Sequence, residues 1–232
     1  MTLSKVHKEI RSQADPKRAK NLSRFFKTGK GQYGQGDIFL GLTVPQSRSI
    51  AKKHLDIDLT DIASLLKSNY HEERLIALLI LNYKFEEATE DEQHKIFSFY
   101  LNNTRYVNNW DLVDLSAPTI VGEYLLNKDT STLYKLAKSD DLWEKRIAIV
   151  ATLMFIRHNK LTDTLKISKI LISDKHDLIH KAVGWALREL GKKDQKLLEN
   201  FLKENIRELP RTTLRYAIER FPEPKRKAYL MM

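Results

Sequence analysis

Cysteine is absent from this sequence of 232 residues, and long apolar runs and chain breakers are scarce. The lack of cysteine excludes disulfides, a thiolate nucleophile and zinc sites of the CxxC type. No segment approaches the run of about 18 to 20 apolar residues that a membrane span needs, and no apolar core of a signal peptide follows the first residue. We therefore expect a soluble protein of the cytoplasm with no membrane partner.

Glycine and proline are the next shortage, with eight and six residues respectively. Five of the eight glycines fall between Gly29 and Gly41, so the rest of the chain has few helix breakers. That remainder is rich in Leu, Lys, Glu, Ile and Ala, which mostly favour helices, and no stretch alternates apolar and polar residues as a strand would. The sequence predicts an all-α protein built from about a dozen short amphipathic helices.

A recurring pattern, in which a basic residue precedes an aliphatic run, predicts structural repeats. Arg146 lies 35 residues before Lys181 and 72 residues after Arg74, and a unit centred near Trp110 would fill the longer gap. The recurring segments are residues 70–77, 142–149, 178–185 and 210–217. A period in the mid-thirties is typical of an α-solenoid of HEAT-like repeats, which is curved and binds partners on its concave face. We expect one such domain over residues 1–232, with a generic four-helix bundle as the alternative.

The charge balance points to the class of partner. The formal net charge is +10, from 40 Lys and Arg against 30 Asp and Glu. Such an excess favours a polyanion, with nucleic acid before a membrane surface, and predicts that the concave face is basic.

The Gly-rich segment 27–41 is the only loop of any length that the sequence predicts. It contains a GxGxxG match, but no strand is predicted before it, so a dinucleotide site is rejected. Lys27, Lys30 and Tyr33 suit contact with phosphates or with a DNA groove. A plain connecting loop is equally compatible with this composition.

Histidine, the commonest catalytic base, shows no catalytic pattern here. Among the seven histidines, His176 and His180 are four residues apart, but no glutamate completes an HExxH motif. We interpret the pair as part of a solvated helix face, and we expect neither a metal nor a cofactor.

The helix expected around Trp110 carries two acids in different positions. Trp110 and Asp114 are four residues apart and share one face, whereas Asp111 points about 100° away. With Asn108 as the N-cap, Asp111 stands at the third helical position, where a carboxylate satisfies the cap and the helix dipole. Asp114 has no such explanation. It is either an ordinary surface or ion-paired residue beside a core tryptophan, or a functional carboxylate.

The other two tryptophans differ in their surroundings. Trp185 falls with Lys181 and Arg188 on the face opposite an apolar stripe, which core packing explains poorly unless neighbouring helices cover both faces. That stripe comprises Ile179, Ala182, Val183, Ala186, Leu187 and Leu190. Trp143 shares its stripe with aliphatic residues and is predicted to lie in the core, with Arg146 at the edge of the stripe and free to reach a phosphate.

Three segments, 110–114, 142–146 and 181–189, closely resemble the HEAT-like-repeat DNA glycosylases, which are AlkD-type DNA alkylation repair enzymes. Their order and separations also match, and the resemblance extends from about Arg24 to Arg220. It implies that Asp114 is the catalytic aspartate, that Trp110 and Trp185 line the site, and that double-stranded DNA is the partner.

The resemblance also implies DNA contacts. Arg146 matches a DNA-backbone-contacting arginine of the family. We expect further backbone contacts from cations on the inner helices, namely Lys145, Lys181 and Arg188. The family's tyrosine on an early helix falls at Phe25, and the Gly-rich loop with Lys27 and Lys30 is longer than in the best-known members.

These observations leave three hypotheses about function. The first is a monomeric DNA glycosylase of base excision repair, which releases purines alkylated at N3 or N7 with the help of Asp114. The second, motivated by Phe25 and the long loop, is a non-catalytic binder of damaged, distorted or branched DNA. The third is a HEAT-repeat scaffold for another protein, for which the net charge suggests an acidic partner.

Overall fold

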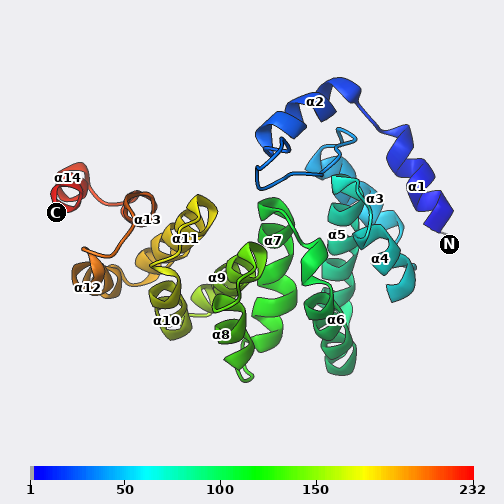
Figure 1. Ribbon diagram of the computed structural model, residues 1–232. Coiled ribbons are helices and arrows are strands. Elements are labelled where there is room, and N and C mark those ends of the chain that lie inside the picture. Colours follow the sequence, from blue (N-terminus) through cyan, green and yellow to red (C-terminus); the bar gives the residue numbers. More distant parts are fainter. Residues whose placement is uncertain (1–2) are drawn as a thin grey trace. The chain divides into compact units, whose positions relative to one another are not determined.

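The computed structural model describes residues 3–232, and its regular elements in this range are all helices (Figure 1). The α-helices are α1 (Leu3–Ser12), α2 (Pro16–Phe25), α3 (Val44–Lys53), α4 (Leu59–Leu66), α5 (His71–Glu87), α6 (Glu90–Asn102), α7 (Trp110–Ala117), α8 (Ser131–Ala137), α9 (Leu142–Arg157), α10 (Thr162–Leu171), α11 (Asp177–Lys193), α12 (Gln195–Asn205), α13 (Arg211–Ala217) and α14 (Glu223–Met231). A 3₁₀-helix, η1 (Thr104–Tyr106), and a π-helix, η2 (Pro118–Glu123), flank α7. The all-α prediction is confirmed, and no helix in the described range is long and apolar enough to cross a membrane.

The chain divides into two compact units, of which the first ends at Ser116 and the second comprises Ala117–Met232. In the first unit α5 packs against α3, α4 and α6, and α1 lies against α3. Thirteen of the 17 residues of α5 are buried, because it is surrounded by other helices. By contrast, α2 has no buried residue.

The second unit is built from rows of helices. α9, α11 and α13 follow one another in one row, and α8, α10 and α12 each pack against that row. The residues predicted to form the apolar stripe of α11 are all buried, whereas Lys181, Trp185 and Arg188 are only half-buried. Trp143 is buried in α9, as predicted for a core residue.

The predicted repeat corresponds to the starts of helices. α5, α7, α9, α11 and α13 begin at residues 71, 110, 142, 177 and 211, so each start follows the previous one by between 32 and 39 residues. The unit expected near Trp110 is therefore present as α7. These starts confirm that the sequence recurrence marks a helical repeat; the curvature and the basic concave face stay predictions.

The predicted Gly-rich loop is also present, since no helix lies between Phe25 and Val44. Near its end the loop runs beside the residue that precedes α5, where Ile38 forms an isolated parallel bridge with Tyr70. The loop is therefore attached to the N-terminal end of α5.

Candidate functional site

The first turn of α7 is fixed by its own polar side chains. The helix begins at Trp110, and the carbonyl of Asn109 accepts a hydrogen bond from the backbone N–H of Val113 (3.2 Å). The side-chain oxygen of Asn109 accepts the N–H of Trp110 (2.8 Å), and Oδ1 of Asp111 accepts the N–H of Leu112 (2.9 Å). The N-cap is therefore Asn109, and the assignment of Asn108 as the cap, with Asp111 at the third position, was wrong by one residue.

The Trp110 indole is held by aromatic rings from the end of α2 and the residue after it. The ring of Phe26 stacks on it, with 5.1 Å between centroids and an interplanar angle of 12°. Phe25 meets it edge-on at 5.9 Å, and Phe25 itself is 63% exposed. The stack continues from Phe26 to Phe39 (4.9 Å) and from Phe39 to the imidazole of His71 (4.5 Å). One face of the half-buried Trp110 indole is thus covered by protein.

Asp114 lies one helical turn beyond Trp110 and is half-buried. Burial raises the pKa of the Tyr100 hydroxyl, and the nearby charge of Asp114 raises it further, against the effect of a hydrogen bond to Ser116. Tyr100 therefore stays a neutral phenol close to this carboxylate. An indole and a carboxylate on one helix face are what a cationic sugar or base needs from a binding surface.

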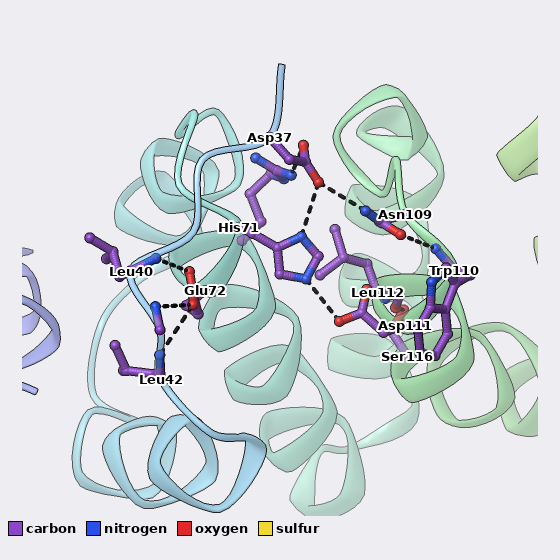
Figure 2. A network of polar contacts seen from close by, with 12 residues as sticks. Asp37, Leu40, Leu42, His71, Glu72, Asn109, Trp110, Asp111, Leu112 and Ser116 are labelled. Carbon is purple, nitrogen blue, oxygen red and sulfur yellow. Dashed lines mark hydrogen bonds and ion pairs between the residues drawn. The ribbon is translucent and has the colours of Figure 1, made fainter. Parts of the chain in front are cut away.

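A buried polar network lies between the start of α7, the start of α5 and the Gly-rich loop (Figure 2). Nε2 of His71 is 2.8 Å from Oδ2 of Asp111, and Nδ1 is 3.1 Å from Oδ2 of Asp37, in the Gly-rich loop. Asp37 also accepts hydrogen bonds from Asn109 (2.9 Å) and from the guanidinium of Arg74 (2.5 Å). Because all five side chains are buried, these contacts are shielded from water and join the loop, α5 and α7.

The electrostatics of the network favour charged side chains. Burial lowers the pKa of His71, but the charge of Asp111 and the hydrogen bonds to Asp111 and Asp37 outweigh it and raise the pKa to about 9. Burial raises the pKa of Asp37, yet the hydrogen bond from His71 and the charge of Arg74 leave it below its usual value. His71 is therefore an imidazolium at neutral pH.

The next two residues of α5, Glu72 and Glu73, also bind other segments through their buried carboxylates. The carboxylate of Glu72 accepts the backbone N–H groups of Leu40 (2.9 Å), Gly41 (2.8 Å) and Leu42 (3.2 Å) (Figure 2). Glu73 binds α1 through His7 (3.1 Å) and Arg11 (2.9 Å). Sequence reasoning treated these residues only as part of a repeat. Four consecutive ionisable residues, 71–74, ahead of a long aliphatic run were the available signal that the turn is buried and paired.

The predicted DNA contacts of the first unit are exposed. Lys27 and Lys30 both point to solvent, and Nζ of Lys27 lies 5.9 Å from the ring centroid of Tyr33. No acidic residue occurs between Pro16 and Gly36, whereas six Lys and Arg residues do. They are Lys17, Arg18, Lys20, Arg24, Lys27 and Lys30. Five of the six are exposed, whereas Arg18 is half-buried and paired with Asp15.

The predicted contacts of the second unit are mostly engaged within the protein. Arg146 is 5% exposed and donates to the carbonyl of Leu178 (2.7 Å). The other three cations are paired with carboxylates: Lys145 with Asp174, Lys181 with Asp177, and Arg188 with Glu219. Half-buried Trp185 lies on α11 between Lys181 and Arg188. Phe25 and Trp110 are in contact, while the grouping of Trp185 with Asp114 stays a prediction.

The histidine pair has a structural role. Nδ1 of His176 accepts the N–H of Leu178 (3.2 Å) and caps α11, and Nε2 of His180 donates to the carbonyl of Asp174 (2.5 Å). The interpretation of this pair as a solvated face therefore misses these two hydrogen bonds. Within residues 3–232 no group of three or more His, Asp or Glu residues has the arrangement of a metal site.

Comparisons with known proteins identify a family and a shared fold. The family model described as DNA alkylation repair enzyme matches residues 6–221. A solved structure from Enterococcus faecalis, described as a predicted DNA alkylation repair enzyme, is similar with a TM-score of 0.71 and 18% identity, covering 91% of this chain and 98% of that one. AlkD2 from Streptococcus mutans is similar with a TM-score of 0.56 and 16% identity, covering 89% and 98%. At such identities the two structures show a shared helical-repeat fold. No curated protein matches the chain.

Proposed function

Because the chain belongs to the family of DNA alkylation repair enzymes, we propose that it is a monomeric, cytoplasmic DNA glycosylase, which hydrolyses the N-glycosidic bond of purines alkylated at N3 or N7 in duplex DNA. The observation that carries the proposal is the half-buried side of α7. There Trp110 and Asp114 stand one turn apart, both half-buried, on a helix whose first turn is fixed by a buried polar network. A rigid indole and carboxylate pair suits a cationic substrate.

The chemistry requires little more than a carboxylate and water. An N3- or N7-alkylated purine is already positively charged, so the bond from C1′ to the base breaks without a general acid. Asp114 then faces a sugar with oxocarbenium character and orients the water whose oxygen bonds to C1′, while the released proton passes to the carboxylate or to solvent. At about 4 Å and an effective dielectric near 20, a carboxylate and a unit cation interact by roughly 4 kcal/mol. That is about a thousandfold in rate if the interaction exists only in the transition state.

The indoles have a supporting role in this proposal. Each indole that faces the cationic sugar or base contributes on the order of 0.5 to 2 kcal/mol by cation–π attraction. Trp110 is suited to it because Phe26 fixes its ring plane. We assign the same role to Trp185, which is half-buried on a face of α11 away from the apolar stripe.

We propose that the DNA backbone is bound by cations from both units. Lys27 and Lys30 are exposed and offer their charges directly. In the second unit Lys145, Lys181 and Arg188 are proposed to exchange a carboxylate partner for a phosphate. Arg146, which is buried on α9, is also proposed to contact the DNA backbone. Such contacts weaken steeply with salt because they release counterions.

The test is base release from methylated duplex DNA by Asp114→Asn. We expect the variant to keep duplex affinity but to release 7-methylguanine at least tenfold more slowly, because an amide cannot neutralise the sugar cation. Asp91→Asn, at an exposed acid of α6, is the matched control and should retain the wild-type rate. Equal rates for both variants would remove Asp114 from the mechanism.

The contact between exposed Phe25 and Trp110 favours a second candidate, a non-catalytic binder of damaged, distorted or branched DNA. In that case the Phe25 ring and the long loop serve for binding, and the indole is not used in catalysis. Tight binding to a four-way junction, together with no base release from heavily methylated DNA, would select this candidate over the glycosylase.

A further inference from the structure

We infer that His71 is the positioning residue for α7: as an imidazolium bonded to both Asp37 and Asp111, it holds the first turn of this helix and the Trp110 indole in place. The inference rests on the proposed function only in so far as α7 carries the reactive side chains. His71 itself is 1% exposed and acts through Asp111, so it is not a catalytic residue.

The geometry requires both ring nitrogens of His71 to be donors. Each nitrogen faces a carboxylate oxygen, at 2.8 Å for Asp111 and 3.1 Å for Asp37. An ionised carboxylate only accepts hydrogen bonds, so a neutral imidazole would leave one lone pair facing another. The remaining oxygens of these two carboxylates bind the N–H of Leu112 and the guanidinium of Arg74, which also donate. The network therefore offers two acceptors to a doubly protonated ring and no donor that would satisfy a bare ring nitrogen.

Charge balance leads to the same conclusion. The groups that face His71 are Asp37 from the loop, Asp111 from α7 and Arg74 from its own helix, while Phe26 and Phe39 lie against the ring. With His71 protonated, two cations balance two carboxylates. Loss of the proton leaves one uncompensated negative charge in a buried site, which is costly.

The network acts on the part of α7 that bears the proposed site. Asp111 is the second residue of the helix and follows Trp110 directly, so its bond to His71 fixes the direction in which the helix begins. The same imidazolium ends the ring stack that runs through Phe39 and Phe26 to Trp110. His71 thus supports the indole from two directions, through the backbone and through the rings.

The pH dependence follows from the sign of the shift. The pKa of His71 rises from 6.5 to about 9 in the folded protein. The imidazolium therefore supports α7 fully at neutral pH, and the support is lost as the pH rises through about 9. Base release should decline over the same range.

The first experiment needs no enzymatic activity. NMR spectra of protein with ¹⁵N-labelled histidine should show His71 with both nitrogens protonated at pH 7.5 and titrating near pH 9. In a Trp143→Phe, Trp185→Phe background Trp110 is the sole tryptophan, and its fluorescence should change with the same midpoint. His71→Gln should abolish that change, and His158→Gln, at an exposed histidine, should leave it intact. A neutral His71 at pH 7.5, or an unaltered Trp110 signal in His71→Gln, would overturn the inference.

The second experiment is the pH profile of 7-methylguanine release between pH 6 and 10. We expect the wild-type rate to fall above pH 9, and His71→Gln to be at least tenfold slower at pH 7.5 in kcat, with little change in KM and no alkaline decline. If His71→Gln fails to fold, Asp111→Asn replaces it, since it removes the same ion pair from the other side. A wild-type rate that stays constant to pH 10 overturns the inference. If wild type releases no base at any pH, the proposed function fails, and the NMR and fluorescence results still decide the role of His71.

Discussion

The first turns of α5 and α9 occupy the same place in the sequence repeat, yet they are used differently. Arg74 and Arg146 correspond, are 4% and 5% exposed, and each donates to a main-chain carbonyl, of Ser68 (2.8 Å) and Leu178 (2.7 Å) respectively. The shared feature is therefore a buried arginine that bonds to backbone. It is a framework feature of the repeat, because it recurs in both units.

The flanking residues carry the difference. The position of His71 in α5 is occupied in α9 by Trp143, a core residue, and the position of Glu73 by Lys145, which pairs with Asp174. In α5 the four residues 71–74 connect α1, the Gly-rich loop and α7 to one helix end. The residues of α5 that differ from their counterparts in α9 thus lie at the end of α5 that holds α7 in place. α7 is the helix proposed to carry the chemistry.

The sharpest test of this contrast compares a buried ion pair with a partly exposed one. Arg74→Met should destabilise the protein by about 3–5 kcal/mol, because Asp37 loses one of its two cationic partners and one negative charge of the buried network is left uncompensated. Lys145→Met in α9 should cost about 1 kcal/mol, because its pair with Asp174 is partly exposed, at 20% and 9% for the two side chains. Urea unfolding at pH 7 measures both. Equal losses would mean that the two helix starts are energetically alike.

The contrast extends to alkaline pH. The pKa of His71 is raised to about 9, so its contribution to stability is complete below pH 6.5 and disappears as the pH rises through 9. The shift corresponds to on the order of 3 kcal/mol. In the second unit burial lowers the pKa of His176. Its effect on the stability of the folded protein is therefore the opposite, and stability falls as the pH drops below 6.5. The free energy of unfolding, measured from pH 6 to 10, should show the alkaline loss in wild type and not in His71→Gln.

The repeat was predictable from the sequence because an amphipathic helix leaves a periodic pattern of apolar residues within its own segment. The stripe of α11 follows from a spacing of three to four residues, and it is buried as expected. The start of α7 was placed one residue too early, because Asn108 and Asn109 are both acceptable caps and tertiary bonds decide between them.

The network was not predictable in the same way. Its bonds join residues that are 34, 40 and 72 positions apart in the sequence. These residues come from the Gly-rich loop, the start of α5 and the first residues of α7 with their N-cap. No periodic signal marks such a set, since each partner is chosen by packing and not by spacing. The sequence showed Asp111 as an acid with a structural role, but it contained no indication that the partner is His71.

The loop attachment at Glu72 gives a smaller test, confined to the first unit. Gly41 has φ of +89°, and a Cβ there would lie 2.1 Å from the carbonyl oxygen of Asp15. Gly41→Ala should therefore cost more than about 2 kcal/mol, through strain and through the loss of its bond to Glu72. Gly31→Ala is the control, since φ is +76° but nothing lies within 4 Å, and about 1 kcal/mol is expected. Similar losses would show that the close approach to α2 is unimportant.

The smallest expected effect concerns DNA affinity, and it again compares residues of the first unit with a residue of the second. Lys27 and Lys30 are exposed, so replacing both by alanine should reduce the slope of log K against log salt by about 2. Lys145 must first leave Asp174, to which it is bound at 2.6 Å, so Lys145→Ala should change the slope by less than about 1. Fluorescence anisotropy with a labelled duplex between roughly 50 and 200 mM salt measures both. A larger change for Lys145→Ala would mean that DNA binding relies more on the paired cations of the second unit than on the cationic stretch from α2 into the loop.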